Sequence, residues 1–159
     1  MNSPLPSAAE TPAKKRTLVP RDAATLIVVD RSSDAAAVKE PRILMGHRSG
    51  KHVFMPNTFV FPGGRLDPED VGIPAHGDLR APVMQRLQRK ASARKARALA
   101  CAAIRETFEE TGLIIGAPHN GNYAASKVTP DWEPFFATGM APRLDCLDYV
   151  ARAVTPPNN

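Results

Sequence analysis

Three closely spaced glutamates carry the strongest chemical signal in this sequence. Glu106, Glu109 and Glu110 lie in the stretch Ala93–Gly112, ARKARALACAAIRETFEETG, whose composition predicts a helix. At about 100° per residue, these side chains fall within about a third of the helix circumference. Hard cations such as Mg²⁺ and Mn²⁺ take oxygen ligands. The spacing therefore indicates a candidate divalent-cation site, and solvated acids on a surface helix are the alternative.

The other side of the same helix is apolar. Cys101, Ile104 and Phe108 recur at intervals of three and four residues, which is the pattern of a buried stripe. Ser92 is a suitable N-cap, and Gly112 is a suitable stop after the last turn. The helix is therefore expected to bury one face and to present its carboxylates on the other.

Short apolar segments before the helix predict strands. Ala24–Asp30 is β-branched and apolar, and Ile43–Arg48 and Thr58–Phe61 follow it. The third segment runs into Pro62-Gly63-Gly64, where the glycines allow a close backbone approach that other residues do not. Asp148–Val154 is expected to form a last strand.

From Gly64 to Leu113 the sequence resembles the Nudix hydrolases. The box of that family reads Gly, five residues, Glu, seven residues, then Arg-Glu-aliphatic-x-Glu-Glu-x-Gly-aliphatic. Residues 105–113, RETFEETGL, match its second half, and FVFPGG at residues 59–64 is similar to the approach to the box. The resemblance implies an α+β fold, a Nudix-type α/β/α sandwich with a mixed sheet.

The sequence departs from the pattern of the family in several places. Asp70 stands where the box has Glu, Thr107 replaces an aliphatic residue, and 34 residues separate Asp70 from Arg105 instead of seven. A long insert, here about residues 65–91, is similar to that of the subgroup containing the peroxisomal coenzyme A diphosphatases and their bacterial relatives. The final strands and helix of the family fold have no counterpart after residue 154, so we expect a C-terminally truncated chain and a sheet with an unpaired edge.

The resemblance also implies a chemistry, because Nudix enzymes cleave a diphosphate linked to another moiety, X. It implies that Glu106, Glu109 and Glu110 bind Mg²⁺ or Mn²⁺, and that the Gly63 carbonyl adds a ligand. A metal beside a diphosphate neutralises charge and activates water. Either Glu109 or Glu110 would then accept the proton of the attacking water.

Further residues are candidates for supporting roles. Arg105 and Glu109 stand at i,i+4, so an ion pair between them would orient the glutamates. Asp70 is a candidate outer metal ligand. Gly64 and Arg65 are candidate contacts to the substrate, and a solvated loop arginine is the alternative for Arg65.

These residues leave three functional hypotheses. The first is a Mg²⁺-dependent Nudix diphosphatase acting on a nucleoside-diphosphate derivative, with coenzyme A and acyl-CoA as candidate substrates. The others are a non-catalytic Nudix-like binding module and an inactive truncated fragment. The expected partner of the first is a small diphosphate molecule, not nucleic acid. The sequence does not indicate an oligomeric state.

The composition gives the remaining expectations, which concern partners, domain organisation and location. The 159 residues carry a formal net charge of +5, which favours anionic partners only weakly. Residues 1–20 are expected to form a disordered basic tail, and residues 21–159 a single Nudix domain. Two cysteines give no disulfide framework, and no apolar leader or bilayer-length run is present. A cytoplasmic protein is expected, with Trp132 and its neighbouring aromatics in the core rather than stacked on a base.

Overall fold

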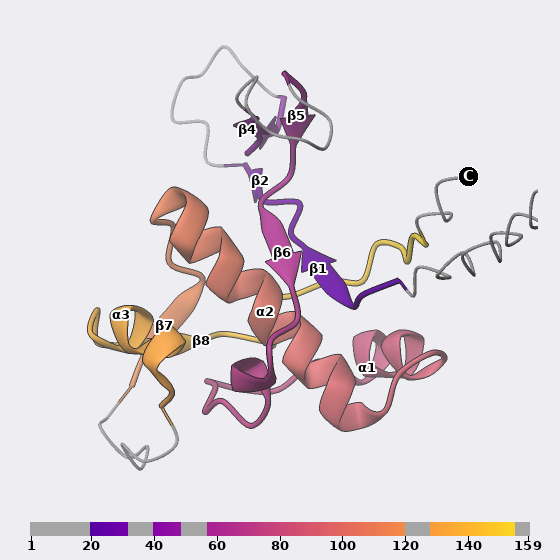
Figure 1. Cartoon of the computed structure of the whole chain (residues 1–159), viewed down its shortest axis with the longest axis vertical. Helices are drawn as coiled ribbons and strands as arrows, with labels where there is room; N and C mark the ends of the chain where they lie inside the picture. The colour runs from indigo at the N-terminus through magenta and orange to yellow at the C-terminus, as the bar shows by residue number, and fades with distance from the viewer. Residues whose placement is uncertain (1–19, 32–39, 49–56, 120–127, 155–159) are drawn as a thin grey trace, which may run out of the picture.

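The computed structural model describes residues 20–31, 40–48, 57–119 and 128–154 (Figure 1). Within those ranges the helices are α1 (Ala81–Gln88), α2 (Ala93–Thr111) and α3 (Glu133–Phe136), with short 3-10 turns η1 (Pro68–Asp70) and η3 (Pro130–Trp132). The strands are β1 (Ala23–Thr25), β2 (Val29–Asp30), β3 (Arg42–Ile43), β4 (Gly46–His47), β5 (Phe59–Val60), β6 (Gly63–Arg65), β7 (Gly116–Pro118) and β8 (Met140–Pro142).

Helix α2 begins and ends where the sequence predicts. The Ser92 side chain accepts a hydrogen bond from the Lys95 backbone N–H at 3.2 Å, which caps the first turn. Gly112 adopts the left-handed conformation, with φ of 71°, and its N–H donates to the Phe108 carbonyl at 2.8 Å. Both predicted caps are confirmed.

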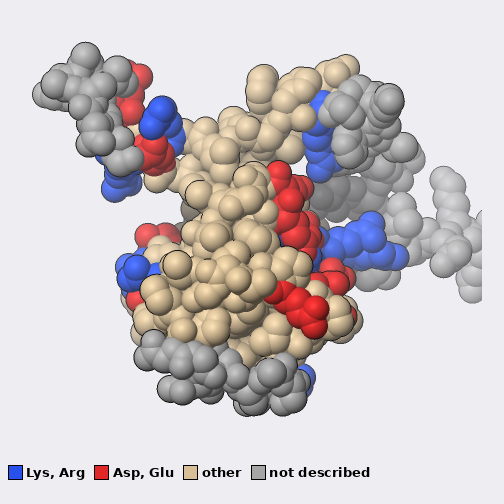
Figure 2. Space-filling view, turned by 90° about the vertical axis from the view of Figure 1, so that its left-hand side faces the viewer, with Lys and Arg blue, Asp and Glu red and all other residues tan. Residues whose placement is uncertain are grey.

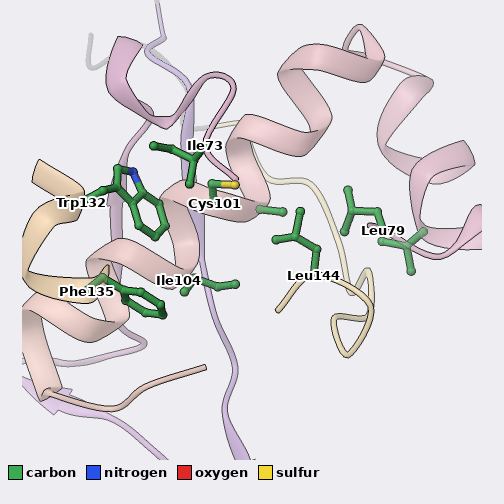
Figure 3. Close-up of a cluster of buried hydrophobic side chains, with 9 residues drawn as sticks. Ile73, Leu79, Cys101, Ile104, Trp132, Phe135 and Leu144 are labelled. Carbon is green, nitrogen blue, oxygen red and sulfur yellow. The ribbon is translucent and has the colours of Figure 1, made fainter. Parts of the chain in front are cut away.

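The apolar side of α2 forms the centre of the core. Cys101 and Ile104 are fully buried against Trp132 and Phe135, which come from η3 and α3 (Figure 3). The Phe108 and Phe135 rings meet edge to face, 5.2 Å between centroids. The predicted apolar stripe and the predicted core role of these aromatics are therefore confirmed.

The Pro-Gly-Gly segment joins this helix to an antiparallel strand pair. Strands β1 and β6 pair with Thr25 opposite Gly63, and they cross α2 in Figure 1. A Cβ added at Gly63 would lie 2.4 Å from the Ala24 carbonyl oxygen, and one added at Gly64 would lie 2.3 Å from the Glu106 carboxylate. The two glycines thus permit contact with β1 on one side and with α2 on the other.

The α+β class is confirmed, and the described strands pair two by two. Pairs β1–β6, β2–β3, β4–β5 and β7–β8 are all antiparallel, and a single parallel bridge joins His76 to Arg143. This arrangement is less continuous than the expected mixed sheet. The predicted strand at Ala24–Asp30 is interrupted between Thr25 and Val29, where pairing changes from β6 to β3.

The prediction of a strand at Asp148–Val154 is wrong, because those residues form no regular element in the structure. Apolar alternation makes a strand only where a neighbour can accept its backbone hydrogen bonds, and no described strand pairs with this segment.

The expected insert contains ordered structure. Residues 65–91 include the end of β6, η1 and α1, and Leu79 and Val83 of this region are buried beside α2. The predicted tail, apart from Pro20, lies outside the described residues. No helix among the described ranges is both long enough and apolar enough to cross a bilayer.

Candidate active site

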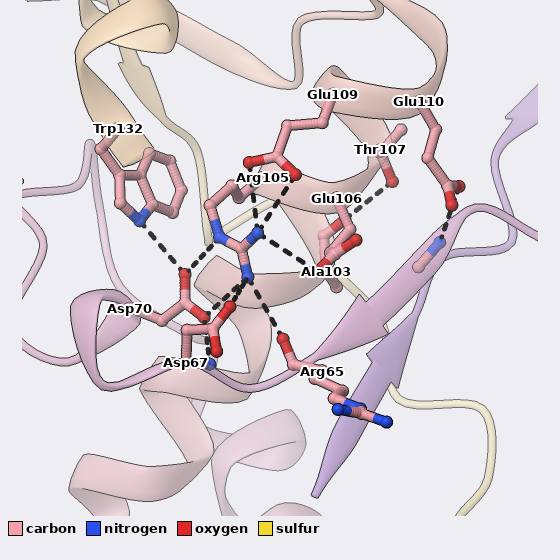
Figure 4. A network of polar contacts seen from close by, with 11 residues as sticks. Arg65, Asp67, Asp70, Ala103, Arg105, Glu106, Thr107, Glu109, Glu110 and Trp132 are labelled. Carbon is pink, nitrogen blue, oxygen red and sulfur yellow. Dashed lines mark hydrogen bonds and ion pairs between the residues drawn. The ribbon is translucent and has the colours of Figure 1, made fainter. Parts of the chain in front are cut away.

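The acidic face of α2 meets the glycine bend of β6. The Gly63 N–H donates to Glu110 Oε2 at 3.2 Å, and the Glu106 carboxylate lies directly against Gly64 (Figure 4). Any side chain at Gly64 would displace Glu106. The structure therefore brings together two of the three predicted glutamates at the bend.

Arg105 holds the third glutamate. Its Nη1 lies 3.2 Å from both carboxylate oxygens of Glu109 and 3.2 Å from Glu106 Oε1. The predicted i,i+4 ion pair is thus present in the structure. The Arg105 side chain is only 4% exposed and that of Glu109 is 44% exposed, so the guanidinium is shielded from water while the Glu109 carboxylate remains open to solvent.

Asp70 is the buried counter-ion of Arg105. The Asp70 side chain is 0% exposed, and Arg105 donates to it in bidentate fashion, from Nε to Oδ1 at 2.9 Å and from Nη2 to Oδ2 at 3.1 Å. Oδ1 also accepts from Trp132 Nε1 at 3.1 Å, and Oδ2 from the Asp67 N–H at 2.9 Å. A carboxylate has about four acceptor positions. All are filled by protein donors here, and Asp70 anchors Arg105.

The loop after β6 completes this set of contacts. Arg105 Nη2 also donates to the Arg65 carbonyl oxygen at 3.2 Å and to Asp67 Oδ2 at 3.3 Å. The Arg65 side chain itself is exposed. We call Asp67, Asp70, Arg105, Glu106 and Glu109 the Arg105 network. Sequence reasoning missed Asp67 and the bond from Trp132; a capping box around η1, with Asp67 three residues before Asp70, was the available signal for Asp67.

The surroundings of the network stabilise the charged form of Arg105 and destabilise the charged form of Glu106. Burial by itself lowers the pKa of Arg105, but hydrogen bonds and charge attraction from Asp70 and Glu109 outweigh it and hold the pKa above its ordinary value. Burial raises the pKa of Glu106, Arg105 opposes this, and the charges of Glu109 and Glu110 add to it. A positive charge added beside these carboxylates would relieve that cost.

The donor set fits a hard cation in kind. All three glutamates offer carboxylate oxygens, and the glycine bend leaves Glu106 and Glu110 without intervening side chains. Over the described ranges, no three acidic, histidine or cysteine side chains are already gathered around one point as ligands. Glu109 instead faces Arg105, while Glu106 and Glu110 face the bend.

Comparisons with known proteins found one curated relative and one solved structure that are similar to this chain. The acyl-coenzyme A diphosphatase NUDT19 of Xenopus laevis is 31% identical over 138 residues, a match that spans 64% of this chain and 36% of that protein. The crystal structure of a Nudix hydrolase from Alicyclobacillus acidocaldarius superposes with a TM-score of 0.56 at 29% identity, covering 87% of this chain and 64% of that one. No family profile matches the chain.

Both matches support the assignment of the chain to the Nudix hydrolases, as the sequence predicts. The chain spans about a third of the length of the curated relative and just under two thirds of the solved structure.

Proposed function

We propose that this chain acts as a divalent-cation-dependent Nudix diphosphatase on a nucleoside-diphosphate derivative, with acyl-CoA and coenzyme A as the first candidates. The contact between the Gly63-Gly64 bend and the carboxylates of Glu106 and Glu110 carries the proposal. The similarity to an acyl-coenzyme A diphosphatase supports the choice of substrate class. A cytoplasmic location stays a prediction. Cys101 and Cys146 are both free in the structure.

Glu106, Glu109 and Glu110 would hold Mg²⁺ or Mn²⁺, with the Gly63 carbonyl as a further candidate ligand. When bound, such an ion neutralises diphosphate charge and lowers the pKa of a bound water. Glu106 is the most constrained of these residues, since Gly64 on one side and Arg105 on the other fix its carboxylate. Asp70 takes the role of anchor for Arg105 in this proposal, in place of the outer ligand predicted from sequence.

The chain's own contacts favour Glu110 as the proton acceptor. Both oxygens of Glu109 accept from Arg105, which orients that carboxylate. Glu110 is exposed and accepts from the Gly63 N–H. Glu109 is exposed as well, but a general base must be able to reach the proton that it removes, and the buried Arg105 guanidinium already holds the Glu109 carboxylate. Gly64 and the exposed Arg65 stay candidate contacts to the substrate phosphates.

A substrate panel tests the proposal. Acyl-CoA, coenzyme A, ADP-ribose and NADH are incubated with the protein and Mg²⁺, and diphosphate cleavage is followed by chromatography. Loss of a positioned acid or base costs about 10²–10⁴-fold in rate, so Glu110→Gln should fall by that amount. Glu133→Gln, an exposed acid at the start of α3, is the matched control and should keep full activity.

Two results would contradict the proposal. One is that the folded wild-type protein cleaves none of the four diphosphates; tight nucleotide binding without turnover would then indicate the binding module. The other is cleavage that is equally fast in Glu110→Gln, Glu109→Gln and wild type, which would place the reaction elsewhere.

A further inference from the structure

A tryptophan from outside the box is bonded into the Arg105 network. Trp132 lies 62 residues from Asp70 in the chain, and its Nε1–H donates to Asp70 Oδ1 at 3.1 Å (Figure 4). Both side chains are completely buried. Beside them, the Asp131 backbone N–H donates to Glu69 Oε2 at 3.3 Å, so η3 contacts η1 at two points. The contact is a specific polar junction within the core.

This junction acts on the oxygen that positions Arg105. Oδ1 of Asp70 accepts from both Arg105 Nε and Trp132 Nε1. An ionised carboxylate without access to water needs hydrogen bonds to remain stable in one orientation. Asp67 fixes the other oxygen through its backbone N–H. Removing the indole donor would leave Oδ1 with the guanidinium as its single partner in the described structure, so the carboxylate and the guanidinium would be held at one point fewer.

The position of the Arg105 guanidinium in turn determines where the carboxylates of Glu106 and Glu109 are held on α2. The same guanidinium that Asp70 grips through Nε and Nη2 holds Glu109 and Glu106 through Nη1. Because the guanidinium is planar and rigid, a rotation at its Asp70 edge moves the Nη1 edge as well. The chain of contacts therefore runs from Trp132 through Asp70 and Arg105 to the carboxylates.

We propose that Trp132 is a positioning residue for the glutamates of α2, acting through Asp70 and Arg105. The part of this inference that concerns cations rests on the proposed function, and the part that concerns Arg105 does not. Groups that orient metal ligands from behind typically contribute about 10–100-fold to metal affinity, and Trp132 stands in that relation to Glu106 and Glu109.

The test compares Trp132→Phe, which keeps an aromatic ring but lacks the donor, with Phe135→Leu. Phe135 packs 5.4 Å from the Trp132 ring, centroid to centroid, in the same cluster. Both variants should lose some stability through packing. In Trp132→Phe, Mn²⁺ affinity measured by electron paramagnetic resonance should fall about tenfold, whereas Phe135→Leu should bind Mn²⁺ like wild type.

A second readout needs no metal. The Arg105 Nε–H signal in ¹⁵N NMR, assigned by its loss in Arg105→Lys, should be protected from solvent exchange in wild type and in Phe135→Leu. It should exchange at least about tenfold faster in Trp132→Phe, since a loosened salt bridge admits water. Equal exchange in all three folded proteins would overturn the inference, even if the cation site itself proves absent. Equal Mn²⁺ affinity in wild type and Trp132→Phe would also overturn it, while leaving the proposed function intact.

Discussion

Two Arg–Asp ion pairs in this molecule are similar in length and different in surroundings. Arg105 and Asp70 lie 2.9 Å apart with side chains 4% and 0% exposed, whereas Arg42 and Asp30 lie 2.6 Å apart with side chains 76% and 41% exposed. The first pair is enclosed by η1, α2 and η3, and the second joins β2 to β3. Burial, rather than distance, decides which pair matters for stability.

The same contrast applies to the apolar side chains of the two regions. Ile104 and Phe135 are buried at α2, whereas Ile43 and Phe59 are 51% and 68% exposed on what we call the outer strands, β2 to β5. Figure 1 shows β2, β4 and β5 apart from the body of α2. Figure 2 shows a broad uncharged face with acidic side chains gathered along part of its border. The tightly packed side chains thus surround α2, the helix that carries the glutamates, rather than the outer strands.

Thiol labelling gives the largest expected difference between buried and exposed sites. Burial raises the pKa of Cys101 from 9.0 to about 12, so the reactive thiolate is scarce and the sulfur is enclosed by the core. Cys146 is exposed. Native protein should therefore incorporate one equivalent of iodoacetamide, at Cys146, and a second only in urea. Rapid labelling of Cys101 in native buffer, detected by peptide mass spectrometry, would mean that the α2 core opens readily.

Matched arginine variants test whether the buried ion pair contributes more to stability than the exposed one. Arg105→Ala leaves the Asp70 charge buried without its counter-ion and should cost about 3–5 kcal/mol in the free energy of unfolding. Arg42→Ala removes an exposed pair and should cost about 1 kcal/mol or less. Urea unfolding followed by circular dichroism measures both. Similar losses in the two variants would refute the distinction drawn between the pairs.

Matched phenylalanine variants test the packing contrast. Phe135→Ala removes a ring that contacts both Trp132 and Phe108, and large-to-small changes at such positions cost about 3–5 kcal/mol. Phe59→Ala removes a ring that is 68% exposed and should cost far less. Chemical unfolding of the two variants checks this. A larger loss for Phe59→Ala would show that the outer strands are covered in solution.

The pH dependence of metal-free stability gives the smallest expected effect. Because the folded-state pKa of Glu106 is raised, its favourable contribution is complete below its unfolded pKa and is lost as pH rises through the folded value. Glu106→Gln avoids that loss. In EDTA, the Tm of the variant relative to wild type should therefore increase between about pH 4 and pH 7. A decrease over that range would mean that the attraction of Arg105 outweighs burial.

Local signals in the sequence predicted the helix well. The apolar spacing, Ser92 and Gly112 together specify α2, since capping and burial of a stripe depend on neighbours within the same helix. Thr107 shows how a polar residue is accommodated at a position where the box pattern has an aliphatic one. It is fully buried, and its hydroxyl donates to the Ala103 carbonyl at 2.7 Å, so a polar residue occupies an aliphatic position with its hydrogen bond made.

Contacts between residues far apart in the chain could not be predicted from the sequence. Asp70 was a candidate outer metal ligand, and the sequence did not predict its bonds to Arg105, 35 residues away, and Trp132, 62 residues away. No periodicity links such positions, because only the folded chain brings η1, α2 and η3 together. The strand at Asp148–Val154 was wrong for the same reason, since strand formation depends on a partner elsewhere in the chain.

Mn²⁺ binding measured by electron paramagnetic resonance, with Mg²⁺ as competitor, tests directly whether the three glutamates of α2 hold a divalent cation. We expect a saturable Mn²⁺ site in wild type, displaced by Mg²⁺, that is lost when E106Q, E109Q and E110Q are combined and kept in E133Q. Absence of binding by the folded wild-type protein, or equal binding by the triple variant, would contradict the claim that α2 and the glycine bend form a cation site.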